Sequence, residues 1–202
     1  MTVNRHEGHD NRDDAKETGR LEAFSDGVYA VVITLLALDL KVPHVHSGTD
    51  AWALAQALAG QWPSYLAFVT SFFTVLIMWV NHHTVFKLVH KSNVHLLFTN
   101  GVLLMLTTAV PFTTALVTEY LRLPGAKIAC AVYGGTFVLI AAAYNVLWYC
   151  VSHDRRLLKQ DAPEHIVNRI TRNYRFGVPL YLIATFGALA SAYVTIGICT
   201  AL

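Results

Sequence analysis

The sequence predicts an all-α protein, a polytopic bundle of membrane-spanning helices, and three observations support this fold class. First, 54% of the 202 residues are hydrophobic and only 14% are charged, whereas soluble domains carry about a quarter charged residues. Second, the apolar residues gather in blocks of about twenty or more, the length of a helix that crosses about 30 Å of hydrocarbon. Third, these blocks are continuous rather than alternating, which disfavours a β-barrel.

Five apolar blocks follow one another along the chain. They predict helices at about 20–41, 62–89, 94–120, 125–151 and 176–202. The last block is long for one span and short for two, so we expect about six spans per chain, with the last one short or incomplete. Residues 1–19 are polar and contain no apolar signal-peptide core. We therefore expect a mobile cytoplasmic tail, followed by a single transmembrane domain at 20–202.

Two connecting segments and one proline predict further detail. Asp50 is placed to cap a short helix at the membrane surface, and the polar segment 152–175 has a helix-like composition. Pro111 lies inside the third block, where a proline kinks a helix. Three nearby threonines are able to satisfy the carbonyl groups that this proline frees: Thr107, Thr108 and Thr113.

The distribution of Lys and Arg predicts the orientation of the chain in the membrane. With a cytoplasmic N-terminus, twelve of the 15 Lys and Arg residues lie on the inner side, and only Lys41, Arg122 and Lys127 lie on the outer side. Cytoplasmic loops of membrane proteins carry such an excess of positive residues. We therefore expect a multi-pass protein of the cell membrane whose N-terminus is cytoplasmic.

The first apolar block carries two distinct faces. In a helix, Thr34, Leu35 and Leu38 follow Val31 at i+3, i+4 and i+7 and form one stripe. Asp26 lies about 140° away from Val31, almost on the opposite side. That side stays mostly small, with Ala30, Ile33 and Ala37. The helix thus has one face of branched apolar residues plus a threonine, and a slim opposite face that begins with a polar group.

The start of this block places charged groups next to an apolar run. Arg20, Ser25 and Asp26 lie within its first two turns, and a charged group in hydrocarbon is costly unless it has a partner or faces water. We interpret these residues as a polar clasp that pairs internally or with an adjacent helix and so fixes the rotation of the first helix. The alternative is a plain helix start with an interfacial arginine, and composition alone leaves both open.

Four residues near the N-terminus fit a sequence signature. They are Arg20, Phe24, Ser25 and Asp26, in the order R-x-x-x-F-S-D. Three further stretches accompany them, at 27–39, Trp79–His83 (W-V-N-H-H) and Val110–Thr113 (V-P-F-T). In these stretches, which cover the first three blocks, the chain resembles the prokaryotic branch of the lysosomal potassium channel family, the transmembrane protein 175 family.

The resemblance implies a potassium-selective cation channel without a cofactor, in which four identical chains surround a central pore in the lipid bilayer. It also implies that the first helix lines the pore and that no T-V-G-Y-G carbonyl filter is present, a motif that this sequence lacks. Carried over by distance from the F-S-D motif, the narrowest ring falls on Val31, with further layers at Leu35 and Leu38 and a hydroxyl group at Thr34. The family usually has isoleucine or leucine at the constriction, so valine implies a slightly wider gap.

Several histidines gather near the expected cytoplasmic ends of the second and third blocks. They are His82, His83, His90 and His95. A metal or haem site is disfavoured because His82 and His83 point about 100° apart and no thiolate or carboxylate lies beside them in the sequence. We instead expect Trp79, Asn81 and one of these two histidines to be hydrogen-bond partners of the clasp.

A proton- or cation-coupled secondary transporter is the alternative function, with Asp26 or Asp39 as its site, since intramembrane carboxylates often serve this role. Asp39, however, lies near Lys41 at the outer end of its helix, which indicates an interfacial position. The sequence also lacks a pair of broken helices in matching halves, the usual indication of a transporter site. It contains no nucleophile–base pair, phosphate loop or nucleic-acid surface, so we expect neither enzyme activity nor nucleic-acid binding.

Overall fold

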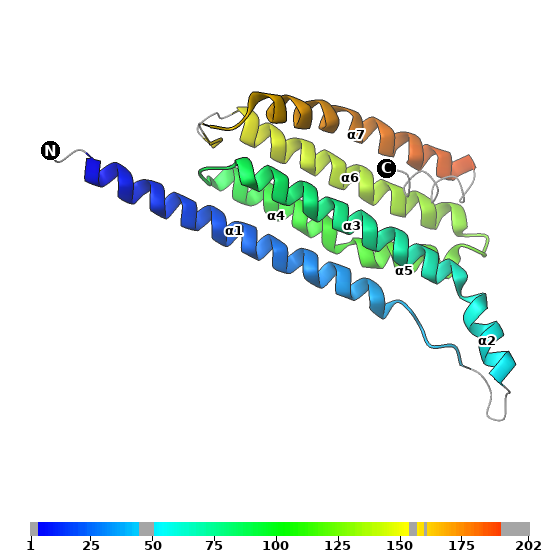
Figure 1. The fold of residues 1–202 in the computed structure, drawn as a ribbon. Coiled ribbons are helices and arrows are strands. Elements are labelled where there is room, and N and C mark those ends of the chain that lie inside the picture. Colours follow the sequence, from blue (N-terminus) through cyan, green and yellow to red (C-terminus); the bar gives the residue numbers. More distant parts are fainter. Residues whose placement is uncertain (1–3, 45–50, 154–156, 160, 191–202) are drawn as a thin grey trace.

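The computed structural model describes residues 4–44, 51–153, 157–159 and 161–190, and this part of the chain is helical apart from its connections. The helices follow in the order α1 (Asn4–Leu38), α2 (Ala51–Gly60), α3 (Trp62–Leu88), α4 (Val94–Thr108), α5 (Val110–Tyr120), α6 (Ala126–His153) and α7 (Glu164–Ala190). Figure 1 shows an elongated bundle in which α1 and α7 lie on opposite sides of the other long helices.

Four segments of the described chain are long and apolar enough to cross a membrane. They are Lys16–Leu38, Trp62–Leu88, Val94–Tyr120 and Ala126–His153. The third of these combines α4 and α5. The predicted fold class, an all-α bundle of membrane helices, is therefore confirmed. We expected one or two helices at 176–202, and the part of this block after residue 190 lies outside the described residues.

The first helix is longer than its apolar block. It begins at Asn4, so the segment that we expected to be a separate polar tail continues the same helix and extends beyond the rest of the bundle (Figure 1). Once a helix has nucleated, each further residue adds a hydrogen bond, and the segment contains no proline to stop it. Hydropathy marks where such a helix enters the lipid and does not mark where it starts.

The last described helix also begins earlier than its apolar block, at Glu164 instead of near 176. Its first half is amphipathic. Ile166, Ile170 and Tyr174 recur every four residues and pack against the core, while Arg169 and Arg172 are exposed. An apolar stripe on one side is enough to hold this half against α6, although its average composition is polar.

The third apolar block is broken at Ala109, which separates α4 from α5. Pro111 stands in the first turn of α5, where a missing backbone N–H is tolerated. The hydroxyl groups of Thr113 and Thr114 donate to the carbonyl group of Val110 at 3.1 Å and 2.8 Å. Local threonine bonds of this kind satisfy backbone groups around a proline in a membrane helix.

A short helix, α2, precedes the second span, as expected. None of its residues is buried in the chain, and Figure 1 shows it projecting from one end of the bundle. Asp50, the expected cap, lies outside the described residues.

The centre of the bundle is α6, which packs against α4, α5 and α7, whereas α1 packs against α3, α4 and α5. The largest fully buried side chains include Tyr29, Phe86, Leu103, Phe137 and Leu147. Two connections are joined at one end, because the His90 N–H donates to the Leu157 carbonyl at 2.6 Å and the Lys159 N–H donates to the Leu88 carbonyl at 2.9 Å. Because α1 lies on one side of the bundle (Figure 1), the other helices support it from that side only.

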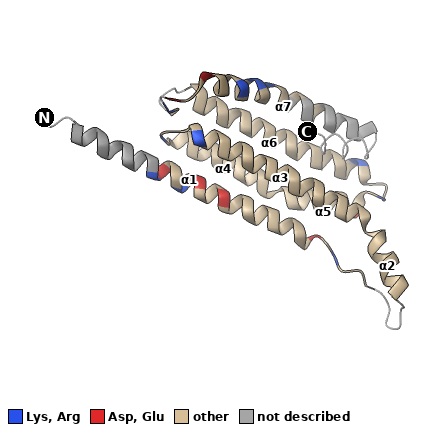
Figure 2. Cartoon of the chain, viewed as in Figure 1, with Lys and Arg blue, Asp and Glu red and all other residues tan. Residues whose placement is uncertain are grey.

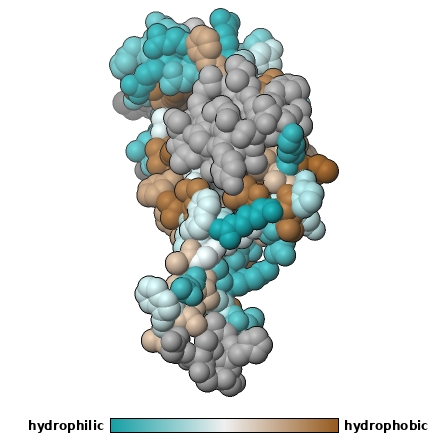
Figure 3. Space-filling model, turned by 90° about the vertical axis from the view of Figure 1, so that its right-hand side faces the viewer, coloured by the Kyte–Doolittle hydropathy of each residue, from teal (hydrophilic) through white to brown (hydrophobic). Residues whose placement is uncertain are grey.

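Charged residues gather at one end of the bundle, where α3 ends and α7 begins (Figure 2). We call this the basic end, because it carries Lys87, Arg169 and Arg172. Along the sides, large apolar residues are exposed, among them Phe73, Ile77, Phe98 and Met105, and a view from the end that carries α2 shows hydrophobic surface on both flanks (Figure 3). Such flanks suit contact with lipid or with other membrane helices.

Candidate functional site

Helix α1 has one face buried against the bundle and one face uncovered. The buried residues are Thr18, Leu21, Ser25, Tyr29, Val32 and Leu36. They recur every three or four residues and therefore share one face. This packed face is not the slim face of the sequence analysis, because Ala30 and Ala37 are exposed and Ile33 is only half-buried. Its larger side chains, Tyr29 and Leu36, fill the space between α1 and the neighbouring helices.

The stripe predicted from helical spacing lies on the uncovered face. Val31, Leu35 and Leu38 are 56%, 40% and 76% exposed, and Thr34 is exposed between them. The Thr34 hydroxyl donates to the Val31 carbonyl group of its own helix at 2.8 Å. The four residues of the stripe thus form a continuous surface that no described part of the chain covers.

Ser25 is the start of a buried hydrogen-bond chain through three helices. Its hydroxyl donates to the Leu21 carbonyl at 2.8 Å and accepts from the Asn100 amide of α4 at 2.9 Å. The Asn100 oxygen lies 2.9 Å from Nε2 of His82 on α3. An amide oxygen only accepts, so Nε2 of His82 carries the hydrogen and donates. All three polar side chains are almost fully buried, and together they link α1 to α4 and α3.

Two acidic residues of α1 contact two stacked rings of α3. The Trp79 indole N–H donates to the Asp26 carboxylate at 2.8 Å, and Nδ1 of His83 lies 2.7 Å from the Glu22 carboxylate. The Trp79 and His83 rings stack with centroids 5.8 Å apart and planes 12° apart. Charge-assisted contacts of this kind are directional, so they define the rotation of α1 against α3.

The remaining residues of the signature and of the expected partners lie elsewhere. Arg20 is exposed and forms no hydrogen bond or ion pair with the described residues, and Phe24 is 63% exposed. Both lie on the Val31 side of α1, because helical geometry places positions seven and eleven residues apart within about 20°. Asn81 is exposed on α3 and is not part of the buried network. The signature is therefore split between the two faces of α1.

Sequence reasoning missed two residues of this network, Asn100 and Glu22. Asn100 stands alone in the apolar run of α4, and a polar side chain inside a span needs a partner. That isolation was an available signal, although it does not reveal which helix supplies the partner. Glu22 occupies a variable position of the signature and gave no signal of its own.

A second polar group lies at the end opposite the basic end. Lys41 and Glu119 form an exposed ion pair with 3.4 Å between Nζ and Oε2. Beside it, Asp39 lines an open cavity of about 440 Å³ together with Gln61 and Ser64. Burial raises the pKa of the Asp39 carboxyl group, and the nearby Lys41 ammonium partly offsets this shift. Asp39 follows Leu38 by one residue, about 100° around the helix, so it faces this cavity and not the stripe.

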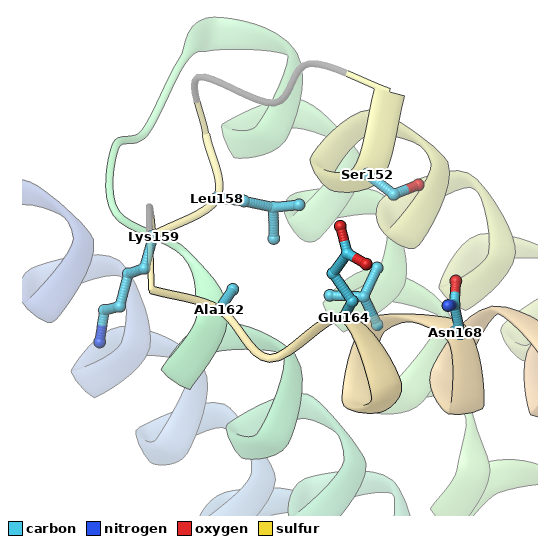
Figure 4. Close-up of a pocket in the computed structure, with 7 residues that line it drawn as sticks. Ser152, Leu158, Lys159, Ala162, Glu164 and Asn168 are labelled. Atoms are coloured by element: carbon cyan, nitrogen blue, oxygen red, sulfur yellow. The ribbon is translucent and has the colours of Figure 1, made fainter.

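Another cavity, of about 500 Å³, lies at the basic end between the end of α6 and the start of α7. Figure 4 shows the Glu164 carboxylate pointing toward Ser152 and Leu158, whereas Lys159 extends away from them. Its lining residues come from α6, α7 and the segment between them, and none of them belongs to α1. This cavity is therefore separate from the stripe and from the buried network.

The histidines do not gather as a metal site. Within the described ranges, no three His, Cys, Asp or Glu side chains come together in a way that could hold a metal ion. His82 instead stacks on Phe86 with centroids 4.3 Å apart and bonds Asn100. The ring thus acts as a packed core residue with one polar partner.

Together, the fold and the site define a polytopic helical membrane protein whose first helix is anchored by polar side chains on one face and uncovered on the other. The family profile described as the endosomal/lysosomal potassium channel TMEM175 matches residues 20–111. A relative from Chamaesiphon minutus, named a potassium channel, is 50% identical over 183 residues, which cover 91% of this chain and 90% of the relative. The chain therefore belongs to the TMEM175 family.

Other comparisons agree with this membership. A crystal structure of a lysosomal potassium-selective channel TMEM175 homologue from Chamaesiphon minutus matches with a TM-score of 0.82 and 47% identity, covering 92% of this chain and 94% of that chain. A human relative, named the endosomal/lysosomal proton channel TMEM175, is 31% identical over 135 residues, which cover 64% of this chain and 27% of the human protein. The described fold is thus one that the family adopts in a crystal structure.

Proposed function

We propose that the protein is a potassium-selective cation channel in which the uncovered stripe of α1 lines the pore and narrows it at Val31. Relatives at 50% and 46% identity, from Chamaesiphon minutus and Streptomyces collinus, are named potassium channels. The observation that carries the proposal for this chain is the exposure of Val31, Leu35 and Leu38 on a helix whose opposite face is buried.

One stripe on one helix cannot enclose a pore, so the proposal requires several identical chains. Closed cyclic symmetry is the usual arrangement of identical subunits, and we propose a homotetramer with the four stripes facing a central axis. This arrangement brings together the apolar residues of the stripe, which a single chain leaves exposed. It also places Arg20 and Phe24, which share the side of Val31, toward the axis or toward the neighbouring subunits.

The proposed selectivity mechanism rests on a hydrophobic constriction. A narrow ring of valine side chains excludes water, and therefore ions, until it widens. An ion that passes must lose part of its hydration shell, which favours the more weakly hydrated potassium ion over sodium. The Thr34 hydroxyl uses its hydrogen in the bond to the Val31 carbonyl, so its oxygen lone pairs are available to a partly dehydrated cation.

The buried network has a supporting role in this proposal. Ser25 and Asp26 are bonded to α4 and α3, and these bonds define which side of α1 faces the axis. Asp26 is held by Trp79, which gives no support to the alternative of a free carboxylate that carries protons or cations in a transporter. No resident cofactor or enzyme activity is part of the proposal.

The proposed orientation follows the positive residues. The basic end carries Lys87, Arg169 and Arg172, and cytoplasmic loops are rich in such residues. We therefore place the basic end, with the start of α1, on the cytoplasmic side of the cell membrane. The cavity at Asp39 then lies on the outer side.

Ion flux into liposomes tests the proposal. Val31→Asn is expected to raise total flux and reduce the preference for potassium over sodium, because an amide ring is wetted more readily than a valine ring. Val80→Asn is the matched control, since Val80 is 48% exposed on α3 and is expected to leave flux and preference unchanged. Saturable uptake that demands a proton gradient would instead favour the transporter. Because the human relative is named a proton channel, proton flux is measured in the same vesicles.

A further inference from the structure

A second buried polar chain reaches α1 from a helix that lies deeper in the bundle. The Tyr29 hydroxyl on α1 is 2.7 Å from the Tyr144 hydroxyl on α6, and the Tyr144 hydroxyl is 2.6 Å from the Met78 carbonyl on α3. Tyr29 and Tyr144 are 1% and 6% exposed. Three helices therefore meet at one pair of phenol groups that the signature does not contain.

The direction of these bonds follows from their chemistry. A carbonyl oxygen only accepts, so Tyr144 uses its hydrogen in the bond to Met78. Tyr144 is then the acceptor for Tyr29, which donates. The Thr107 hydroxyl of α4 lies near the Tyr29 hydroxyl; its hydrogen goes to the Leu103 carbonyl at 2.9 Å, so its oxygen is left to accept. Tyr29 thus has one acceptor on α6 and one alternative on α4.

The location of this pair relates it to the stripe. Tyr29 precedes Val31 by two residues and therefore lies about 160° around the helix from it. When α1 rotates so that Tyr29 moves toward one neighbour, Val31 on the opposite face turns through a similar angle. Tyr144 also touches α7 through the Tyr174 ring, with centroids 5.9 Å apart. The pair is thus placed at the level of the proposed constriction, directly behind it.

We propose that Tyr144 is a positioning residue for α1: by accepting the Tyr29 hydrogen bond, it sets the rotation of α1 and hence the position of Val31. The part that concerns selectivity rests on the proposed function, whereas the rotation of α1 does not. The network at Ser25 and Asp26 anchors α1 near the basic end, and this bond anchors it beside Val31.

Two substitutions separate this role from simple packing. Tyr144→Phe removes the acceptor and leaves the buried Tyr29 hydroxyl with Thr107 as its alternative, which draws α1 toward α4. Tyr29→Phe removes the donor and leaves no group stranded, because Tyr144 still donates to Met78. Tyr144→Phe is therefore expected to have the larger effect, and the double variant is expected to behave like Tyr29→Phe. Independent packing contributions would instead add up in the double variant.

Tyr133→Phe is the matched control. Tyr133 is 4% exposed on the same helix, and its hydroxyl lies 3.1 Å from the Ser71 hydroxyl of α3. It removes an equally buried hydroxyl group from α6 without removing the acceptor of Tyr29.

The experiment combines ion flux with a direct measure of rotation. In a background without cysteine, Val31→Cys and Val32→Cys are labelled with N-ethylmaleimide, since Val31 is exposed and Val32 is buried. Tyr144→Phe is expected to raise the labelling rate at position 32 relative to that at position 31. It is also expected to lower the ratio of potassium to sodium flux. We expect each ratio to change by about fivefold or more, the change in an equilibrium that corresponds to one buried hydroxyl group without a partner. Tyr133→Phe is expected to leave both ratios unchanged.

The outcomes are distinguishable. If Tyr144→Phe and Tyr133→Phe give the same labelling ratio, or if the double variant shows the sum of both single effects, the positioning role of Tyr144 is overturned. If the labelling ratio changes as expected but the unmodified protein shows no potassium flux, Tyr144 positions α1 and the proposed channel function fails. Restoration of both ratios in the double variant to the level of Tyr29→Phe supports the role.

Discussion

The two halves of the membrane part of α1 are held in the bundle in different ways. The half near the basic end contributes the side chains with polar partners on other helices: Glu22, Ser25, Asp26 and Tyr29. The half that follows contributes Val32 and Leu36, which are fully buried but have only apolar contacts. The Thr34 hydroxyl bonds within α1 itself.

This difference has a physical consequence. Hydrogen bonds lose strength steeply when their angles change, so the polar half accepts one rotation of the helix. Apolar contacts are numerous and individually weak, so the other half tolerates small displacements at little cost. The stripe from Val31 to Leu38 lies on the half with apolar contacts. If the proposed constriction lies on that half, it is able to widen while the polar half stays in place.

The largest effect is expected from breaking the polar half. Asn100→Leu removes both the donor of Ser25 and the acceptor of His82, and leaves the buried His82 N–H without a partner. We expect a loss of about 2–3 kcal/mol of stability, since each stranded buried group costs about 1–3 kcal/mol. Thermal unfolding in detergent measures it. Asn81→Leu, at an exposed asparagine of α3, is the control, and an equal loss in both variants would show that the buried network does not anchor α1.

A smaller effect is expected from the apolar half. Leu36→Ala creates a cavity behind α1 and is expected to cost about 2 kcal/mol of stability, at the low end for a buried leucine. Leu35→Ala removes the same atoms from a side chain that is 40% exposed, so unfolding of the single chain is expected to change little, while ion flux changes. If Leu35→Ala destabilises as much as Leu36→Ala and leaves flux unaltered, Leu35 packs in the assembly and does not line a pore.

The smallest effect is expected outside both halves, at Asp39. Burial raises the pKa of this carboxyl group, so the folded protein holds the Asp39 proton more tightly than the unfolded chain. The associated stability is present at low pH and is lost as pH rises through the raised pKa. Asp39→Asn is therefore expected to increase the melting temperature at pH 7 by no more than about 2 °C, with the gain shrinking toward about pH 4. An increase in melting temperature that is independent of pH would contradict this account. Glu119→Gln is the control for the loss of an exposed charge at the same end.

Much of the fold was predictable because it depends on local properties of the sequence. The length of each apolar block predicts a span, and the blocks at 62–89 and 125–151 correspond to α3 and α6 within two residues at either end. The ends of α1 and α7 were not predictable in the same way. Residues 4–19 and 164–175 are too polar to be recognised by hydropathy, yet their helices continue through them.

The candidate site divides along the same line. Spacing alone placed Val31, Thr34, Leu35 and Leu38 on one stripe, because helical phase is set within a few residues. It did not identify the packed face, which carries Tyr29 and Leu36, whereas the small residues Ala30 and Ala37 are exposed. In a membrane helix nearly every side is apolar, so hydropathy carries little information about which side faces another helix.

The sequence by itself therefore determined that this chain is a bundle of membrane helices and which residues of α1 lie on the same side. Only the tertiary structure decided which partners meet: Asn100 is 75 positions from Ser25, and Tyr144 is 115 positions from Tyr29. The reason is physical. In lipid, the backbone groups of a helix are satisfied by hydrogen bonds within the same segment, so each helix depends on local sequence. The rotation of one helix against another depends on side chains that meet only after the helices have packed.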